Sequence, residues 1–164
     1  MNSFIMMAVT MKSSENTAKT VLRTLNASEI APGMRLQYYE HAAMDRAHHK
    51  FTALLGALPL VDKAAFSCLL EQICQEAKEH FEQEERFMLT TEFDQYKAHK
   101  AEHDALLLLL DDQRNSLNAG HQPDAVGLQL KLCHWQDKHQ QEWDYPLADF
   151  LRCRASWLGE GTGI

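Results

Sequence analysis

Histidine is unusually frequent in this chain, with nine among 164 residues. Neutral imidazole is the commonest metal ligand in proteins and the side chain that titrates near neutral pH. Five of the nine histidines fall on the apolar stripes of expected helices. The other four lie in a turn or off these stripes and are predicted to be solvated or at a rim: His41, His49, His121 and His134. The pattern therefore points to metal chemistry in the interior of the fold.

The clearest stripe lies between residues 62 and 89, where apolar residues recur at helical intervals of four and three. It starts with Phe66 and continues through His80 and Glu84. A buried carboxylate without a partner costs several kcal/mol or takes up a proton. A cation close to Glu84 would remove this cost.

Three further segments place histidines on apolar stripes. His99 and His103 are four residues apart, so their rings lie about 40° apart around a helix and face the same way. His48 shares the stripe of an earlier segment, and His139 follows Trp135 on a later one. A lone buried histidine is often only a hydrogen-bonded core residue. Convergence from four segments favours one shared metal site.

Four amphipathic helices are expected to position these side chains. Asp62 is a predicted N-cap, Asn118-Ala119-Gly120 a C-terminal signal, and Pro146 is expected to kink or end the last helix. No stretch alternates with a period of two. The sequence therefore predicts an all-α, antiparallel up-down-up-down four-helix bundle about 30 Å long. Its helices are expected at about 37–58, 62–89, 91–118 and 124–145.

Composition excludes several classes of protein. A mass of 18.8 kDa is typical of a single domain. A net charge of −7 argues against binding to nucleic acid or anionic lipid. The apolar run 105–110 is too short to cross a membrane. We expect an N-terminal extension without an assignable role at 1–35, the bundle at 36–154 and a tail at 155–164.

The cysteines and the N-terminus predict a cytoplasmic protein. No basic residue precedes the apolar N-terminal patch, unlike in a signal peptide. No cysteine pair has a C-x-x-C spacing, so buried, reduced thiols are expected at Cys68, Cys74, Cys133 and Cys153.

Two other kinds of metal site can be compared with these residues. The segment 99–103 spells H-x-x-E-H, which would make Glu102 the general base of a zinc hydrolase. That interpretation leaves the histidines outside this segment unexplained. Ferritin-like di-iron bundles need Glu-x-x-His on two helices. None of His80, His99, His103 and His139 has a glutamate three residues before it.

Four segments together resemble the hemerythrin family, and specifically its bacterial single-domain branch. The resemblance covers about residues 36–150. Its motifs are D-x-x-H at Asp45-Arg46-Ala47-His48, H-F-x-x-E-E at His80-Phe81-Glu82-Gln83-Glu84-Glu85, H-x-x-x-H from His99 to His103, and W-x-x-x-H-x-x-x-x-D at Trp135, His139 and Asp144.

The resemblance implies a non-heme di-iron centre with an oxo or hydroxo bridge. Asp144 enters only through it, because a residue five after His139 lies about 140° around an ideal helix. One iron would have six ligands and the other five, which leaves an open position. The implied ligands are His99, His103 and His139 on one iron, His48 and His80 on the other, and Glu84 and Asp144 bridging both.

The implied function is reversible, non-enzymatic binding of dioxygen for storage, delivery or sensing. Sensing would require a separate signalling partner that the sequence does not name, and the oligomeric state is not indicated. The alternative is a catalyst that uses the same centre to reduce peroxide or nitric oxide.

The chain departs from the family beside Trp135. Gln136 and Gln140 occupy two places where the family usually has aliphatic side chains that help to keep the oxygen pocket dry. A wetter pocket predicts faster loss of dioxygen as peroxide. Alternatively, the two amides point to solvent or make hydrogen bonds behind a ligand.

Overall fold

The structure is a computed structural model that describes residues 39 and 41–160. All its elements are helical, and the described part contains no strand. The prediction of an all-α fold is confirmed. In chain order the elements are α2 (Ala42–Ala57), the 3₁₀ turn η2 (Leu58–Leu60), α3 (Lys63–Thr90), α4 (Tyr96–Asn118), α5 (Ala125–His139), the π-helical turn η3 (Gln140–Asp144) and α6 (Tyr145–Glu160).

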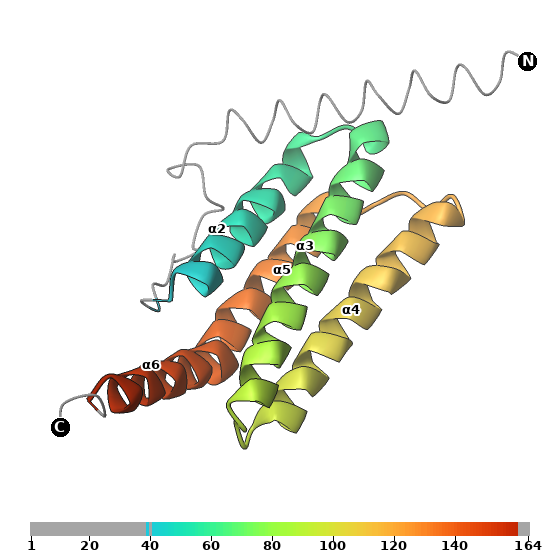
Figure 1. Ribbon diagram of the computed structural model, residues 1–164. Helices are drawn as coiled ribbons and strands as arrows, with labels where there is room; N and C mark the ends of the chain where they lie inside the picture. Colours follow the sequence, from blue (N-terminus) through green and yellow to red (C-terminus); the bar gives the residue numbers. More distant parts are fainter. Residues whose placement is uncertain (1–38, 40, 161–164) are drawn as a thin grey trace, which may run out of the picture.

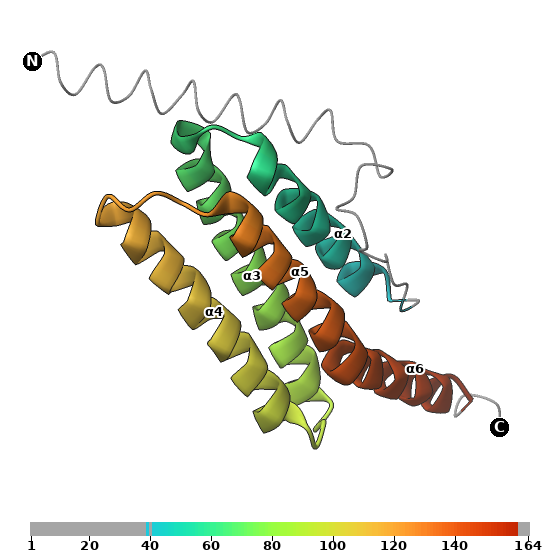
Figure 2. The same ribbon diagram turned by 180° about the vertical axis from the view of Figure 1, so that it is seen from behind.

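Helices α2, α3, α4 and α5 run side by side as the predicted antiparallel bundle (Figure 1). The view from behind shows the same four helices, with α6 leaving the bundle at an angle from the end of α5 (Figure 2). Short connections join successive helices, which makes neighbours antiparallel. No helix in the described ranges is long and apolar enough to cross a membrane.

Side-chain caps fix two of the helix starts. Asp62 accepts a hydrogen bond from the Ala65 N–H at 2.8 Å, as its predicted role as an N-cap requires. Asp124 accepts one from the Gly127 N–H at 2.9 Å. A Cβ on Gly127 would collide with the Asp124 carboxylate in its capping position, so a larger residue here would require this carboxylate to shift.

The predicted start of the third helix near Thr91 is wrong, because α4 begins at Tyr96. Helix α3 ends in a Schellman-type turn in which the Phe93 N–H bonds to the Met88 carbonyl at 2.9 Å. Glu92 takes the left-handed conformation at φ 56°. Glycine usually marks this position, so the turn has no glycine signal in the sequence.

Pro146 was predicted to kink or end the last helix, and it does not end it, since the chain continues through η3 into α6. The distortion expected near this proline is present as the π-helical turn directly before it. Proline lacks an N–H and its ring collides with the carbonyl four residues earlier in a regular α-helix. The wider turn changes the course of the backbone at this place.

Two apolar clusters lie on either side of the level where the predicted ligands occur. The larger is built from α2, α3, α4 and α5 and includes Leu55, Leu70 and Leu132, which are fully buried. The smaller joins the start of α2 and the α3–α4 turn to α6 and includes Met44 and Leu147. Polar side chains occupy the layer between these clusters.

The domain division stays a prediction, because residues 1–35 and the end of the tail lie outside the described residues. No disulfide joins the four cysteines, all of which are described. Cys74 is buried, and Cys68 and Cys133 are half-buried. The expectation of burial is wrong for Cys153, which is exposed on α6.

Candidate metal centre

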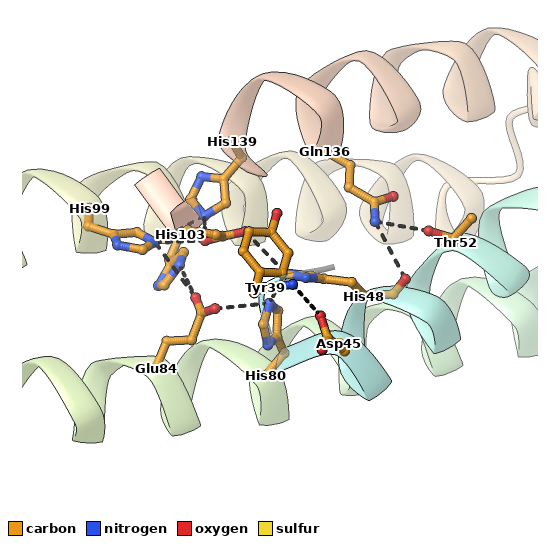
Figure 3. Close-up of polar contacts among 11 residues, drawn as sticks. Tyr39, Asp45, His48, Thr52, His80, Glu84, His99, His103, Gln136 and His139 are labelled. Atoms are coloured by element: carbon orange, nitrogen blue, oxygen red, sulfur yellow. Dashed lines mark hydrogen bonds and ion pairs between the residues drawn. The ribbon is translucent and has the colours of Figure 1, made fainter. Parts of the chain in front are cut away.

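The structure brings all seven predicted metal-binding side chains together in the polar layer. They come from every helix of the bundle and from η3, and none is more than 8% exposed. Figure 3 shows the imidazoles of α2, α3, α4 and α5 gathered around the carboxylate of α3. The seven are His48, His80, Glu84, His99, His103, His139 and Asp144. Their role as ligands stays a prediction.

All five imidazoles turn the same nitrogen, Nε2, toward the two carboxylates. His48 Nε2 lies 3.0 Å from Asp144 Oδ2, and His139 Nε2 lies 3.2 Å from Asp144 Oδ1. His103 Nε2 lies 3.3 Å from Glu84 Oε2. Either ring nitrogen of a neutral imidazole can bind a metal ion, and here Nε2 is the one that faces inward while Nδ1 is left to carry the proton.

The ligand atoms form two groups, and within each group all lie within 4.8 Å of one another. One group has five members and the other four. Only Glu84 and Asp144 belong to both. The first group is Glu84, His99, His103, His139 and Asp144, and the second is His48, His80, Glu84 and Asp144. Two shared carboxylates between two sets of imidazoles is the arrangement of a two-metal site.

The spacing and the hydrogen bonding of the donor atoms are those expected around two cations. The four carboxylate oxygens of Glu84 and Asp144 are buried and accept no well-formed hydrogen bond from the described residues. The Nε2 atoms of His48 and His80 are 2.9 Å apart, and those of His99 and His139 are 3.1 Å apart. Two nitrogens bound at right angles to one metal ion at about 2.1 Å would be about 3.0 Å apart.

The π-helical turn explains how Asp144 reaches the centre. The Tyr145 N–H bonds to the Gln140 carbonyl five residues back. In this wider turn, residues five apart share a face as residues four apart do in an α-helix. Asp144 therefore lies on the same side as His139, although the angle of an ideal helix would separate them.

Burial sets the protonation of the histidines. Desolvation and the neighbouring His48 lower the pKa of His80 to about 3. Burial and the neighbouring His139 and His99 likewise lower the pKa of His103. These two imidazoles are therefore neutral at pH 7, with a lone pair available to a cation.

The two carboxylates differ in their electrostatics. Burial, followed by the charges of Asp144 and Glu85, raises the pKa of Glu84 well above its usual range. Burial also acts to raise the pKa of Asp144, but the surrounding His139, His48 and His99 outweigh it and hold this pKa well below its usual range. A cation between the two would favour the charged form of both.

Aromatic rings hold two of the histidines from behind. Phe81 stacks on His103 with a centroid distance of 3.9 Å, and Trp135 stacks on His139 at 4.3 Å. The Nδ1 of His103 also lies 3.4 Å from Glu85 Oε1. A carboxylate at Nδ1 fixes the tautomer that leaves Nε2 free for a metal ion.

A small cavity of about 10 Å³ lies beside the two-histidine group. That is about the space for one water molecule. Its lining includes all three predicted pocket residues, Trp135, Gln136 and Gln140. The two glutamines are 3% exposed each, so neither points to solvent. The Gln136 Nε2 donates to Thr52 Oγ1 at 3.0 Å and to the His48 carbonyl at 3.5 Å.

Sequence reasoning missed Tyr39, which the structure places against His48 (Figure 3). The predicted start of the first helix near residue 37 is wrong, because α2 begins at Ala42 and Tyr39 lies before it. An ideal helix would also place Tyr39, nine residues before His48, on the opposite face, so helical periodicity does not select it. Glu102, the base of the weighed zinc site, is half-buried and belongs to neither group of potential ligands.

Comparison with known proteins assigns the chain to a family. A family model described as the hemerythrin HHE cation binding domain matches residues 40–146, which is more than half of the chain. The chain belongs to the hemerythrin family. All seven clustered side chains of this hemerythrin-family protein lie inside the matched range.

A curated relative gives the same family. Bacteriohemerythrin from Ralstonia nicotianae (strain ATCC BAA-1114 / GMI1000) is 27% identical over 119 residues, which are 73% of this chain and 82% of the relative. No solved structure matches the chain.

Proposed function

We propose that this protein binds dioxygen reversibly at two non-heme iron ions joined by an oxo or hydroxo bridge. The observation that carries the proposal is the pair of unequal ligand groups, five donors and four, that share Glu84 and Asp144. His99, His103 and His139 would hold one ion and His48 and His80 the other. The name of the Ralstonia relative and the family's description as cation binding support the proposal.

Two ferrous ions, when bound, supply the electrons and the open position that dioxygen binding needs. The residues of the chain provide the surroundings. Neutral imidazoles add no charge, so the two carboxylates alone offset the positive charge of the ions. A protein of this kind stores, delivers or senses dioxygen and is not an enzyme; sensing would require a signalling partner.

Exclusion of water is the second task of these residues. Phe81, Trp135 and the apolar clusters on both sides separate the centre from solvent. A dry site disfavours loss of dioxygen as peroxide, because that loss consumes protons. We place the protein in the cytoplasm, where its cysteines stay reduced. Dioxygen is the proposed ligand, with no nucleic-acid or membrane partner.

The experiment that tests this function is oxygen cycling of the reduced, iron-loaded protein. We expect the visible spectrum to change on exposure to dioxygen and to return under argon over several cycles. Irreversible oxidation in one cycle would contradict reversible binding. Multiple turnovers of peroxide or nitric oxide with a reductant would instead support the reductase alternative.

The polar pocket sets how long the oxygenated protein lasts. Gln140 and Gln136 stand where a dry pocket would have aliphatic side chains, so Gln136→Leu and Gln140→Ile are expected to slow autoxidation. Stopped-flow spectroscopy compares these variants with the wild type. Unchanged lifetimes would show that the hydrogen bond of Gln136 to Thr52 already keeps its amide out of the reaction.

A further inference from the structure

Tyr39 is a buried phenol at the side of the centre that has fewer histidines. Its ring is 3% exposed, and its centroid lies 5.1 Å from that of His48. The hydroxyl oxygen has no hydrogen-bond partner among the described residues. Buried hydroxyls almost always have one, so a group that the protein binds is expected to supply it.

A backbone hydrogen bond and a neighbouring aromatic ring hold Tyr39 in position. The Tyr39 N–H donates to Asp45 Oδ1 at 2.8 Å, and Asp45 lies on α2 three residues before His48. The ring of Tyr145 packs against Tyr39 with a centroid distance of 5.0 Å. Asp45, the aspartate of the D-x-x-H motif, thus anchors Tyr39 next to the histidine of the same motif.

A tyrosine phenol is protonated at neutral pH, and the Tyr39 phenol lies within electrostatic reach of Asp144 and Glu84. Both carboxylates belong to the four-member group that contains His48 and His80. Figure 3 shows the Tyr39 ring beside His48 and His80 of this group. A neutral hydroxyl is therefore available as a hydrogen-bond donor beside the group with fewer potential metal ligands.

We propose that the Tyr39 hydroxyl donates a hydrogen bond to a small, negatively charged ligand bound on the two-histidine side of the centre. The inference rests on the proposed function, because it requires two metal ions with an open position on this side. Tyr39 is then a ligand-binding residue. The small cavity, whose lining includes His48 and Gln140, lies beside the same two-histidine group.

Azide binding to the oxidised, iron-loaded protein tests the proposal. Azide is a small anion that occupies an open position on a ferric ion, and its binding is followed by absorption. Tyr39→Phe keeps the ring and removes only the hydroxyl. We expect it to raise the azide Kd by about tenfold or more, because a hydrogen bond to a charged acceptor is lost.

The matched control is Tyr145→Phe, which removes a hydroxyl from the neighbouring ring. Its azide Kd is expected to stay within about twofold of the wild type. Equal affinities in Tyr39→Phe and the wild type, at two irons per chain in both, would overturn the role of Tyr39 and leave the proposed function standing. Protein that binds no iron would overturn both.

Resonance Raman spectroscopy gives a second readout. The iron–azide vibration of the wild type is expected to shift in D₂O through the exchangeable hydroxyl proton, and this shift should be smaller in Tyr39→Phe. A phenolate-to-iron absorption band that disappears in Tyr39→Phe would overturn the proposal, because Tyr39 would then be a metal ligand and not a donor.

Discussion

The same four helices build two interiors with opposite chemistry. Toward the α2–α3 connection the core is apolar and contains Leu55, Leu70 and Leu132 without exposure to solvent. Along the same stripes toward α6, imidazoles and carboxylates replace the apolar side chains. On α3 this change occurs between Ala77 and His80, within one turn.

The two interiors contribute differently to the free energy of unfolding. Burial of apolar surface stabilises the fold whether or not a ligand is present. The buried carboxyl group of Glu84, whose pKa burial raises, destabilises it until a cation binds. Stability and function are thus divided along the length of the bundle, and substitutions in the two halves should have separable effects.

The largest effect is expected for Glu84→Leu, which removes one of the two shared carboxylates. Iron content should fall from about two per chain to near zero, since both ligand groups lose a member. Elemental analysis after purification measures it. Glu82→Leu makes the same chemical change at an exposed position of α3 and should keep full iron content. Full iron content in Glu84→Leu would remove the shared role of Glu84.

Removal of iron by a chelator should lower the free energy of unfolding by about 4 kcal/mol for each ion when free metal had been present at a thousand times its Kd. Urea denaturation with and without chelator measures this difference. The metal-free protein should keep its helical circular dichroism, because the apolar clusters do not depend on the ions. The same stability with and without iron would contradict a metal requirement of the polar layer.

Leu70→Ala tests the apolar half. It should cost about 2–5 kcal/mol of unfolding free energy through the cavity that it leaves. Iron content should stay at about two per chain, because Leu70 belongs to the apolar cluster and not to the potential metal ligands. Urea denaturation and elemental analysis of one preparation give both numbers. Loss of iron in the folded variant would show that the two halves are not separable.

The smallest effect concerns the thiol of Cys74 within the apolar half. Burial raises its pKa to about 11. At pH 8 its thiolate fraction should be at least about a hundredfold below that of an ordinary cysteine, and reactivity should rise as the pH approaches 11. Alkylation followed by mass spectrometry checks this, with the exposed Cys153 as the comparison. Rapid labelling of Cys74 at pH 8 would contradict a tightly packed apolar half.

The apolar stripes predict most of the fold because each helix buries one continuous face. Five histidines and Glu84 lie on these stripes, so periodicity alone selects them. The start of α4 could not be predicted in this way, because Glu92 adopts a left-handed conformation that glycine usually marks. Local sequence preference does not predict the position of this turn, because tertiary structure sets it.

Helical periodicity selects neither Asp144 nor Tyr39, for different reasons. Asp144 reaches the centre only through a π-helical turn, so an ideal helix places it on the wrong face. Family resemblance selected it instead. Tyr39 lies outside any described helix and approaches His48 through the hydrogen bond of its N–H to Asp45. A contact of this kind depends on the path of the chain before α2, which no spacing rule describes.

The central claim is that seven side chains hold two metal ions in one polar layer. Its most direct test is the number and kind of metal ions in protein purified after expression with iron, measured by elemental analysis against protein concentration. We predict about two irons per folded chain, with oxo-bridge charge-transfer bands in the oxidised protein. One zinc ion per chain and no such bands would contradict it.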